Sequence, residues 1–167
     1  TKRVATLVLN RNLPKPTDEL VEHIQKYDEA LTDVFVIEAG SDKNKLSKYT
    51  TWHAEWDEAK KQGLRYSRGM NYGLSNLWAS NEFEKYDAFF LLTNDTILRR
   101  VPTIKPLIDI LDQNRRIGIL SPCSKTWGEL HLLANITTKY FWYIHNAAYL
   151  IKREFIESVC NTESPGW

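Results

Sequence analysis

Short apolar runs alternate along this chain with segments in which apolar residues recur every three to four positions. Residues 4–9 and 34–37 are nearly continuous apolar runs rich in strand formers, and Leu20, Ile24 and Tyr27 lie between them at helical spacing. A strand, a helix and a second strand in this order form a right-handed crossover between parallel strands. The beginning of the chain therefore predicts an α/β fold with a parallel sheet.

The same alternation continues to the end of the sequence. Further strands are predicted over residues 64–66, 88–92, 117–120, 140–144 and 147–151, and helices over 17–31, 69–80, 104–111 and 153–159. Thr17 is expected to cap the first helix, and another helix is expected within residues 43–62, where Trp52 and Trp56 are one turn apart. No domain boundary is evident, so residues 1–167 are expected to form a single domain, and the opening and closing residues suggest a fragment of a longer chain.

The composition excludes several classes of protein. Lys and Arg number 22 against 21 Asp and Glu, which argues against a nucleic-acid-binding domain. Six Trp, eight Tyr and six Phe argue against disorder. Apolar runs stay far short of the roughly 20 residues that cross a bilayer. Cys123 and Cys160 lack a C-x-x-C partner, so we expect two free, buried thiols in a reducing compartment. A cytoplasmic location follows, with any membrane association through parts outside this chain.

Polar clusters occur where the predicted strands end. Residues 10–12, 38–42 and 93–96 follow strands and carry acids, amides or arginine, and residues 65–69 precede a helix and carry two arginines. Ligands of open α/β sheets bind beyond the carboxyl ends of the strands. This mixture suits a base and ribose, a diphosphate and a divalent metal, although polar residues also fill ordinary loops. Neither a P-loop nor a G-x-G-x-x-G fingerprint is present.

Six segments occur in an order that is typical of one enzyme family. They are residues 8–12 (VLNRN), 37–42 (IEAGSD), 69–74 (GMNYGL), 91–96 (LLTNDT), 118–122 (GILSP) and 148–154 (AYLIKRE). Together they resemble the nucleotide-binding half of the GT-A-fold glycosyltransferases, in particular the inverting family 2. The resemblance covers nearly the whole chain and implies a Rossmann-like α/β/α sandwich with a mostly parallel sheet.

The resemblance also implies which residues bind the donor. The nucleotide-sugar-binding residues that it implies are Asn10, Arg11, Glu38, Arg65, Arg68, Asn71, Asn94 and Asp95. Asp95 would bind the metal, Mn²⁺ or Mg²⁺, and Asn94 would contact the ribose or the metal shell. Thr93 replaces the first acid of the family's D-x-D motif, and Ala39 replaces a common base contact, so the choice among UDP-, dTDP- and GDP-sugars stays open.

The function implied is an inverting, metal-dependent transfer of a hexosyl or deoxyhexosyl group to a hydroxyl of a saccharide acceptor, as in polysaccharide biosynthesis. The catalytic base would be a carboxylate; Glu129 is the candidate within this chain, and the alternative is a base beyond Trp167. Two other functions stay open. One is a non-catalytic nucleotide- or carbohydrate-binding module, and the other is a nucleotidyltransferase of related fold, against which the absence of glycine from residues 10–15 argues.

Overall fold

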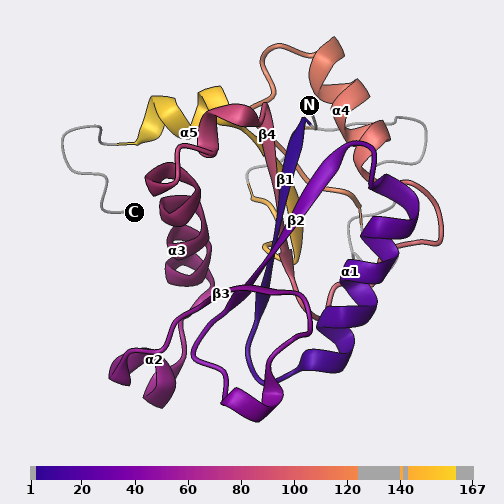
Figure 1. The fold of residues 1–167 in the computed structure, drawn as a ribbon. Helices are drawn as coiled ribbons and strands as arrows, with labels where there is room; N and C mark the ends of the chain where they lie inside the picture. The colour runs from indigo at the N-terminus through magenta and orange to yellow at the C-terminus, as the bar shows by residue number, and fades with distance from the viewer. Residues whose placement is uncertain (1–2, 124–139, 141–142, 161–167) are drawn as a thin grey trace.

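A six-stranded sheet with helices on both faces organises the computed structural model, which describes residues 3–123, 140 and 143–160 (Figure 1). The strands are β1 Val4–Asn10, β2 Thr32–Glu38, β3 Thr50–His53, β4 Ala88–Thr93, β5 Ile119–Leu120 and β6 Ala148–Lys152. The helices are α1 Pro14–Asp28, α2 Asp57–Gln62, α3 Tyr66–Ala79, α4 Ile104–Gln113 and α5 Arg153–Val159, with short 3₁₀ turns η1 Lys43–Lys45 and η2 Phe83–Lys85.

The strand order is β3-β2-β1-β4-β6-β5. Strand β1 pairs in parallel with both β2 and β4, and β2 pairs in parallel with β3. Strand β6 runs antiparallel to its two neighbours, β4 and β5. The mostly parallel α/β sandwich predicted from the sequence is therefore confirmed, and the carboxyl ends of β1, β2 and β4 meet at one edge of the sheet.

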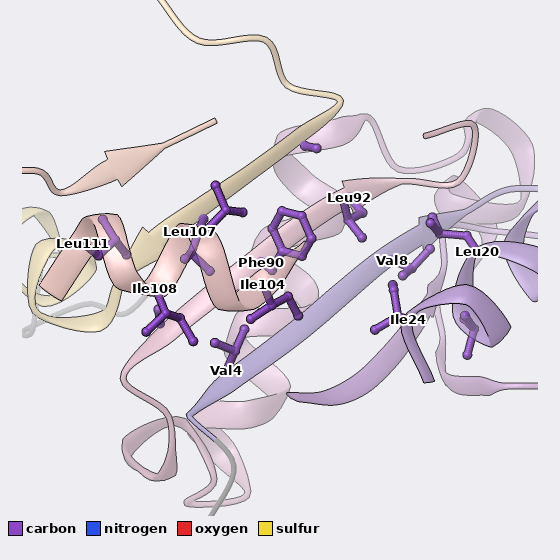
Figure 2. Packing of buried hydrophobic residues seen from close by; sticks show 14 of the residues in the cluster. Val4, Val8, Leu20, Ile24, Phe90, Leu92, Ile104, Leu107, Ile108 and Leu111 are labelled. Atoms are coloured by element: carbon purple, nitrogen blue, oxygen red, sulfur yellow. The ribbon is translucent and has the colours of Figure 1, made fainter. Parts of the chain in front are cut away.

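Helices α1 and α4 cover one face of the sheet. Figure 2 shows Ile24 of α1 and Ile104 of α4 beside Val4, Val8 and Phe90 of the central strands. All five of these side chains are fully buried. Val4, Val8 and Phe90 alternate along their strands with residues that face the other side of the sheet, as the pleat requires.

Helices α3 and α5 and the η2 turn cover the opposite face (Figure 1). Leu77 of α3, Phe83 of η2 and Ile156 of α5 pack there against Leu7 and Phe89. The sheet thus has a hydrophobic layer on each side. No helix among the residues that the structure describes is long and apolar enough to cross a membrane.

The start of α1 differs from the prediction. The helix begins at Pro14, and Thr17 lies within its first turn, where the Thr17 hydroxyl donates to the Leu13 carbonyl at 2.8 Å. Thr17 is therefore not the helix cap. Proline is favoured in the first turn because the N–H groups there have no partner within the helix, so Pro14 and Pro16 start the helix earlier than the polar residues suggested.

The helix expected within residues 43–62 is wrong for most of its length, because only α2 and the short η1 turn are helical there. Trp52 instead lies in β3, and its ring stacks on that of Phe35 in β2 at 5.2 Å. No strand forms over residues 64–66: Leu64 donates one backbone hydrogen bond to Ala39, and α3 then begins.

Two smaller predictions also need correction. Residues 140, 143 and 144 are not in a strand, while 141–142 lie outside the described residues.

Neither cysteine forms a disulfide, as expected, but Cys123 is exposed and Cys160 is half-buried, so the expectation of buried thiols is wrong.

Candidate functional site

Asn10 and Glu38 lie side by side at the carboxyl ends of β1 and β2. The Asn10 side-chain nitrogen Nδ2 donates to both carboxylate oxygens of Glu38, at 3.1 and 2.9 Å. Both side chains are fully buried. A buried carboxylate is tolerated only where hydrogen bonds replace its lost hydration, so these two residues form the centre of a polar cluster beneath the edge of the sheet.

Glu38 also receives three hydrogen bonds from the segment that follows β2. The Ser41 hydroxyl donates at 2.5 Å, the Ser47 backbone N–H at 2.8 Å and the Thr50 hydroxyl at 2.9 Å. The Glu38 carboxylate therefore orders the whole connection from β2 to β3. All of these donors belong to the protein, so Glu38 serves first to hold the loop at the carboxyl end of β2 in place.

The turn after β4 joins this cluster through Asn94, whose Nδ2 donates to the Asn10 side-chain oxygen Oδ1 at 2.8 Å. The turn itself is closed by the Thr96 N–H, which donates to the Thr93 carbonyl at 3.1 Å. The Thr96 hydroxyl donates to the Ala147 carbonyl at 2.7 Å, which ties the turn to the start of β6. Asp95 is exposed within this turn, directly beside the fixed Asn94 contact.

We call Glu38, Asn10 and Asn94 the strand-end relay. It brings together three of the residues implied by the resemblance, from β1, β2 and the turn after β4, and it places the fourth, Asp95, next to it. Their close approach follows from the parallel order of β2, β1 and β4, because parallel strands end at the same edge.

The four other predicted binding residues lie around α3 and the β1 end. Arg11 is exposed, and its Nη1 donates to the Gln62 carbonyl at 2.8 Å. Arg65 is exposed and immediately precedes α3, and Asn71 is half-buried within α3. Arg68 pairs with Glu58 at 2.8 Å, with both side chains about half exposed. Among the described residues, no hydrogen bond joins these four to the strand-end relay.

The described residues contain no group of three or more His, Cys, Asp or Glu side chains that could hold a metal by themselves. Divalent cations in nucleotide sites commonly use one or two protein oxygens, with phosphates and water completing the shell. The exposed Asp95 carboxylate and the neighbouring Asn94 amide suit such a partial site. Glu129, the predicted base, lies outside the described residues.

Sequence reasoning missed three donors that hold the site together. Ser41, Ser47 and Thr50 all bind Glu38. Ser41 lies within segment 37–42, one of the six that resemble the family, although the pattern gave the Ser41 hydroxyl no role. Ser47 and Thr50 lie in a polar, Lys-rich stretch that carries no motif, and only the return of the chain into β3 brings them to the carboxylate.

Tyr66 begins α3 on the same side of the sheet, with its ring 6.3 Å from that of Tyr149 in β6. Burial, with a smaller effect of the Tyr149 hydroxyl, raises the pKa of Tyr66 well above its usual range. The Tyr66 hydroxyl is itself buried, so this phenol stays protonated and is not available as a base to a ligand at the strand ends.

No protein-family model matches this sequence, and no curated protein is similar to it in sequence. The structure is similar to a mannosyltransferase, PcManGT from Pyrobaculum calidifontis, solved in complex with GDP-Man and Mn²⁺. The TM-score is 0.58 and the sequence identity 13%, and the match covers 94% of this chain and 46% of the mannosyltransferase. This chain thus spans about half the length of that enzyme. The likeness and the strand order confirm the predicted GT-A-like fold.

Two further solved structures match at a TM-score of 0.49. One is a glycosyltransferase involved in glycosylation of the major capsid of PBCV-1, with 13% identity over 93% of this chain and 63% of that chain. The other is the galactosyltransferase LgtC in complex with donor and acceptor sugar analogues, with 11% identity over 92% of this chain and 64% of that chain.

Proposed function

We propose that this chain is the donor-binding domain of a glycosyltransferase. The enzyme would move a hexosyl or deoxyhexosyl group from a nucleoside-diphosphate sugar to a hydroxyl of a saccharide acceptor. The observation that carries the proposal is the strand-end relay with Asp95 beside it, at the carboxyl edge of a GT-A-like sheet. Ligands of open α/β folds bind at this edge.

A divalent cation, Mn²⁺ or Mg²⁺, is part of the proposal, and Asp95 and Asn94 would hold it. When bound, such a cation screens the charge on the departing nucleoside diphosphate. The similar mannosyltransferase carries GDP-Man and Mn²⁺, which supports testing Mn²⁺ and GDP first, with UDP and dTDP beside them.

Two arginines would contact the diphosphate on the α3 side. Arg65 is exposed and, among the described residues, has no ion-pair partner, so its guanidinium is free to bind phosphate oxygens. Arg68 would first leave Glu58, which costs little because exposed ion pairs contribute at most about 1 kcal/mol. Arg11 would border the base and ribose and Asn71 the sugar, whereas Asn10, which is fully buried, would act on the site through its hydrogen bond with Asn94.

Inversion at the anomeric carbon requires a carboxylate base that takes the proton of the acceptor hydroxyl. Glu129 remains the candidate within this chain.

A second function, a non-catalytic nucleotide-binding module, is favoured by one observation: Thr93 leaves Asp95 as the single acid of the turn.

Calorimetric titration of the protein with UDP, GDP and dTDP, with and without Mn²⁺, tests the proposal. We expect one nucleotide to bind more tightly with Mn²⁺. Asp95→Asn should weaken that Mn²⁺-dependent binding by about tenfold or more, whereas Asp109→Asn, an exposed acid on α4 paired with Lys105, should not. Failure of all three nucleotides to bind would refute the proposal.

An activity measurement separates the enzyme from the module. The protein is incubated with the sugar conjugate of the nucleotide that binds and a mixture of saccharide acceptors, and release of nucleoside diphosphate is followed. Acceptor-dependent release supports a transferase. Binding without any release supports the module. The anomeric configuration of the product, read by NMR, tests inversion.

A further inference from the structure

The strand-end relay fixes the orientation of the Asn10 amide. Nδ2 of Asn10 faces the Glu38 carboxylate, at 2.9 and 3.1 Å. The opposite end, Oδ1, accepts from the Leu13 backbone N–H at 3.2 Å. A carboxylate accepts hydrogen bonds and a backbone N–H only donates. The Glu38 carboxylate therefore requires the Asn10 nitrogen on its side, and the Leu13 N–H requires the Asn10 oxygen on the other, so both partners favour the same orientation.

This orientation determines the next amide in the relay. Because Oδ1 of Asn10 is an acceptor, Asn94 must turn its Nδ2 toward it, as the 2.8 Å contact shows. The side-chain amide is planar and has one oxygen and one nitrogen. With Nδ2 committed to Asn10, Oδ1 is the end of Asn94 that no described residue engages, and it belongs to the same turn as the exposed Asp95.

We infer that Glu38 acts through Asn10 to make Asn94 present an oxygen, rather than an NH₂ group, to the cation that accompanies the nucleoside diphosphate. Glu38 and Asn10 are thus positioning residues that do not touch the ligand, and Asn94 Oδ1 is an oxygen ligand beside the Asp95 carboxylate. The inference rests on the proposed function. It also accounts for Thr93, because the amide oxygen supplements the single acid of the turn.

The chemistry of hard cations makes this orientation matter. Mg²⁺ takes oxygen ligands, as Ca²⁺ does, and carbonyl and carboxylate oxygens also suit Mn²⁺. An amide NH₂ carries partial positive charge and would repel the ion. A buried group that sets which end of an amide faces a metal therefore changes affinity without contacting the metal, as outer partners of metal ligands generally do.

Glu38→Gln tests the relay in the protein without ligand. The oxygen of the new side-chain amide would receive the Ser47 N–H and keep the 3.1 Å contact from Asn10, while its NH₂ group would replace the acceptor that Asn10 now has at 2.9 Å. Asn10 would lose its shorter contact while the Leu13 N–H still holds its Oδ1, so the Asn10 amide, and with it the Asn94 contact, would loosen. Exchange of the Asn94 side-chain amide hydrogens, followed by NMR, should become roughly tenfold faster, the factor that an ordinary hydrogen bond contributes. Unchanged exchange would overturn the relay.

Thr50→Val is the matched control, because it removes one donor to Glu38 but leaves the carboxylate an acceptor. It should lower stability while the Asn94 exchange rate stays as in the wild type. An equal acceleration in Thr50→Val would mean that any disturbance of Glu38 loosens the turn, which would also overturn the relay.

Titration with Mn²⁺ in the presence of the nucleotide tests the ligand role by calorimetry. Asn94→Ala leaves the contacts of Glu38 in place and should weaken Mn²⁺ binding by about ten- to a hundredfold, as should Glu38→Gln if it folds. Wild-type affinity in Asn94→Ala would overturn the ligand role while leaving the proposed function intact. A wild-type protein that binds no nucleoside diphosphate would refute the proposed function, and the exchange measurement would still decide the relay.

Discussion

At the scale of single residues, Gly40, just after β2, has a backbone conformation and a close contact with α2 that only glycine allows. Its φ is +84°, and an added Cβ would lie 1.9 Å from the Ala59 carbonyl oxygen in α2. Gly63 also has a positive φ, +70°, but its Cβ would meet the Arg11 guanidinium, which is the flexible end of a side chain. A backbone clash cannot be relieved without moving an element.

Gly40→Ala should therefore destabilise the protein by more than about 3 kcal/mol, because strain and overpacking add. Gly63→Ala should cost about 1–2 kcal/mol, mostly backbone strain, and should release Arg11 from Gln62. Urea unfolding followed by circular dichroism measures both. Equal losses would show that the contact with α2 adapts.

His23 on α1 gives the stability a pH dependence. Its Nε2 is buried without a hydrogen-bond partner among the described residues, and its ring lies 4.7 Å from that of Tyr27. Burial lowers the pKa of His23 below the ordinary 6.5, although the nearby Asp28 charge opposes this. The unfolded chain therefore binds a proton at a higher pH than the folded protein does.

Stability should fall as the pH drops from about 7 through 6.5 toward the lowered pKa of the folded state, and level off below it. His23→Gln cannot take up this proton, so its free energy of unfolding should change less over the same range. Urea unfolding at a series of pH values measures the difference between the two proteins. Parallel curves would show that His23 titrates alike in both states.

The chemistry of the candidate site could be predicted at this scale, but its connections could not. Asn10, Glu38 and Asn94 stand at strand ends, so their position along the chain singled them out. Three of the four partners of Glu38 come from residues 41–50, and the Asn10–Glu38 and Asn10–Asn94 contacts join segments far apart in sequence. Such pairing depends on how the chain folds back, which local patterns do not encode.

At the scale of elements, α4 is capped by another helix. Asp28, the last residue of α1, is buried, and its carboxylate accepts the backbone N–H groups of Thr103 and Ile104, each at 3.0 Å. The first N–H groups of a helix have no partner within it. Thr103 makes no side-chain cap of its own, so Asp28 supplies the cap from outside and couples α1 to α4.

Asp28→Ala should cost about 1–3 kcal/mol, because it removes the cap and leaves one buried and one partly buried N–H donor unpaired. Asp109→Ala, which removes an exposed pair with Lys105 on the same helix, should cost less than about 1 kcal/mol. Thermal and urea unfolding compare the two. Similar losses would mean that water replaces Asp28 at the helix start.

Elements with a strong apolar period could be predicted from the sequence. Helices α3, α4 and α5 and strands β1 and β4 lie where the spacing placed them, because each buries one face or both faces in the core. The segment from η1 to α2 has few apolar anchors. There Trp52 packs on Phe35 across the sheet, so a tertiary contact, rather than local spacing, decides the structure.

At the scale of the whole molecule, the sequence predicted the class of fold but not the order of its strands. Consecutive strands with helices between them predict parallel neighbours, and β1 and β2, joined through α1, follow that rule. Strand β3 also runs parallel to β2, but it lies where a helix was expected. Strand β6 enters between β4 and β5 in the opposite direction. Its apolar run fits either direction, so the antiparallel pairing of β6 could not be predicted from that run.

The central strand β4 joins both hydrophobic layers, since Phe90 packs toward α1 and α4 and Phe89 toward α3 and α5. Both rings are fully buried. Phe90→Ala should therefore cost about 3–5 kcal/mol and weaken the far layer as well as its own. Native-state hydrogen exchange should show equal loss of protection for the slowest amides of α1 and α3, and Phe89→Ala, the matched variant on the opposite face, should give the same pattern. Loss confined to the layer that carries the substitution would show that the two layers open independently.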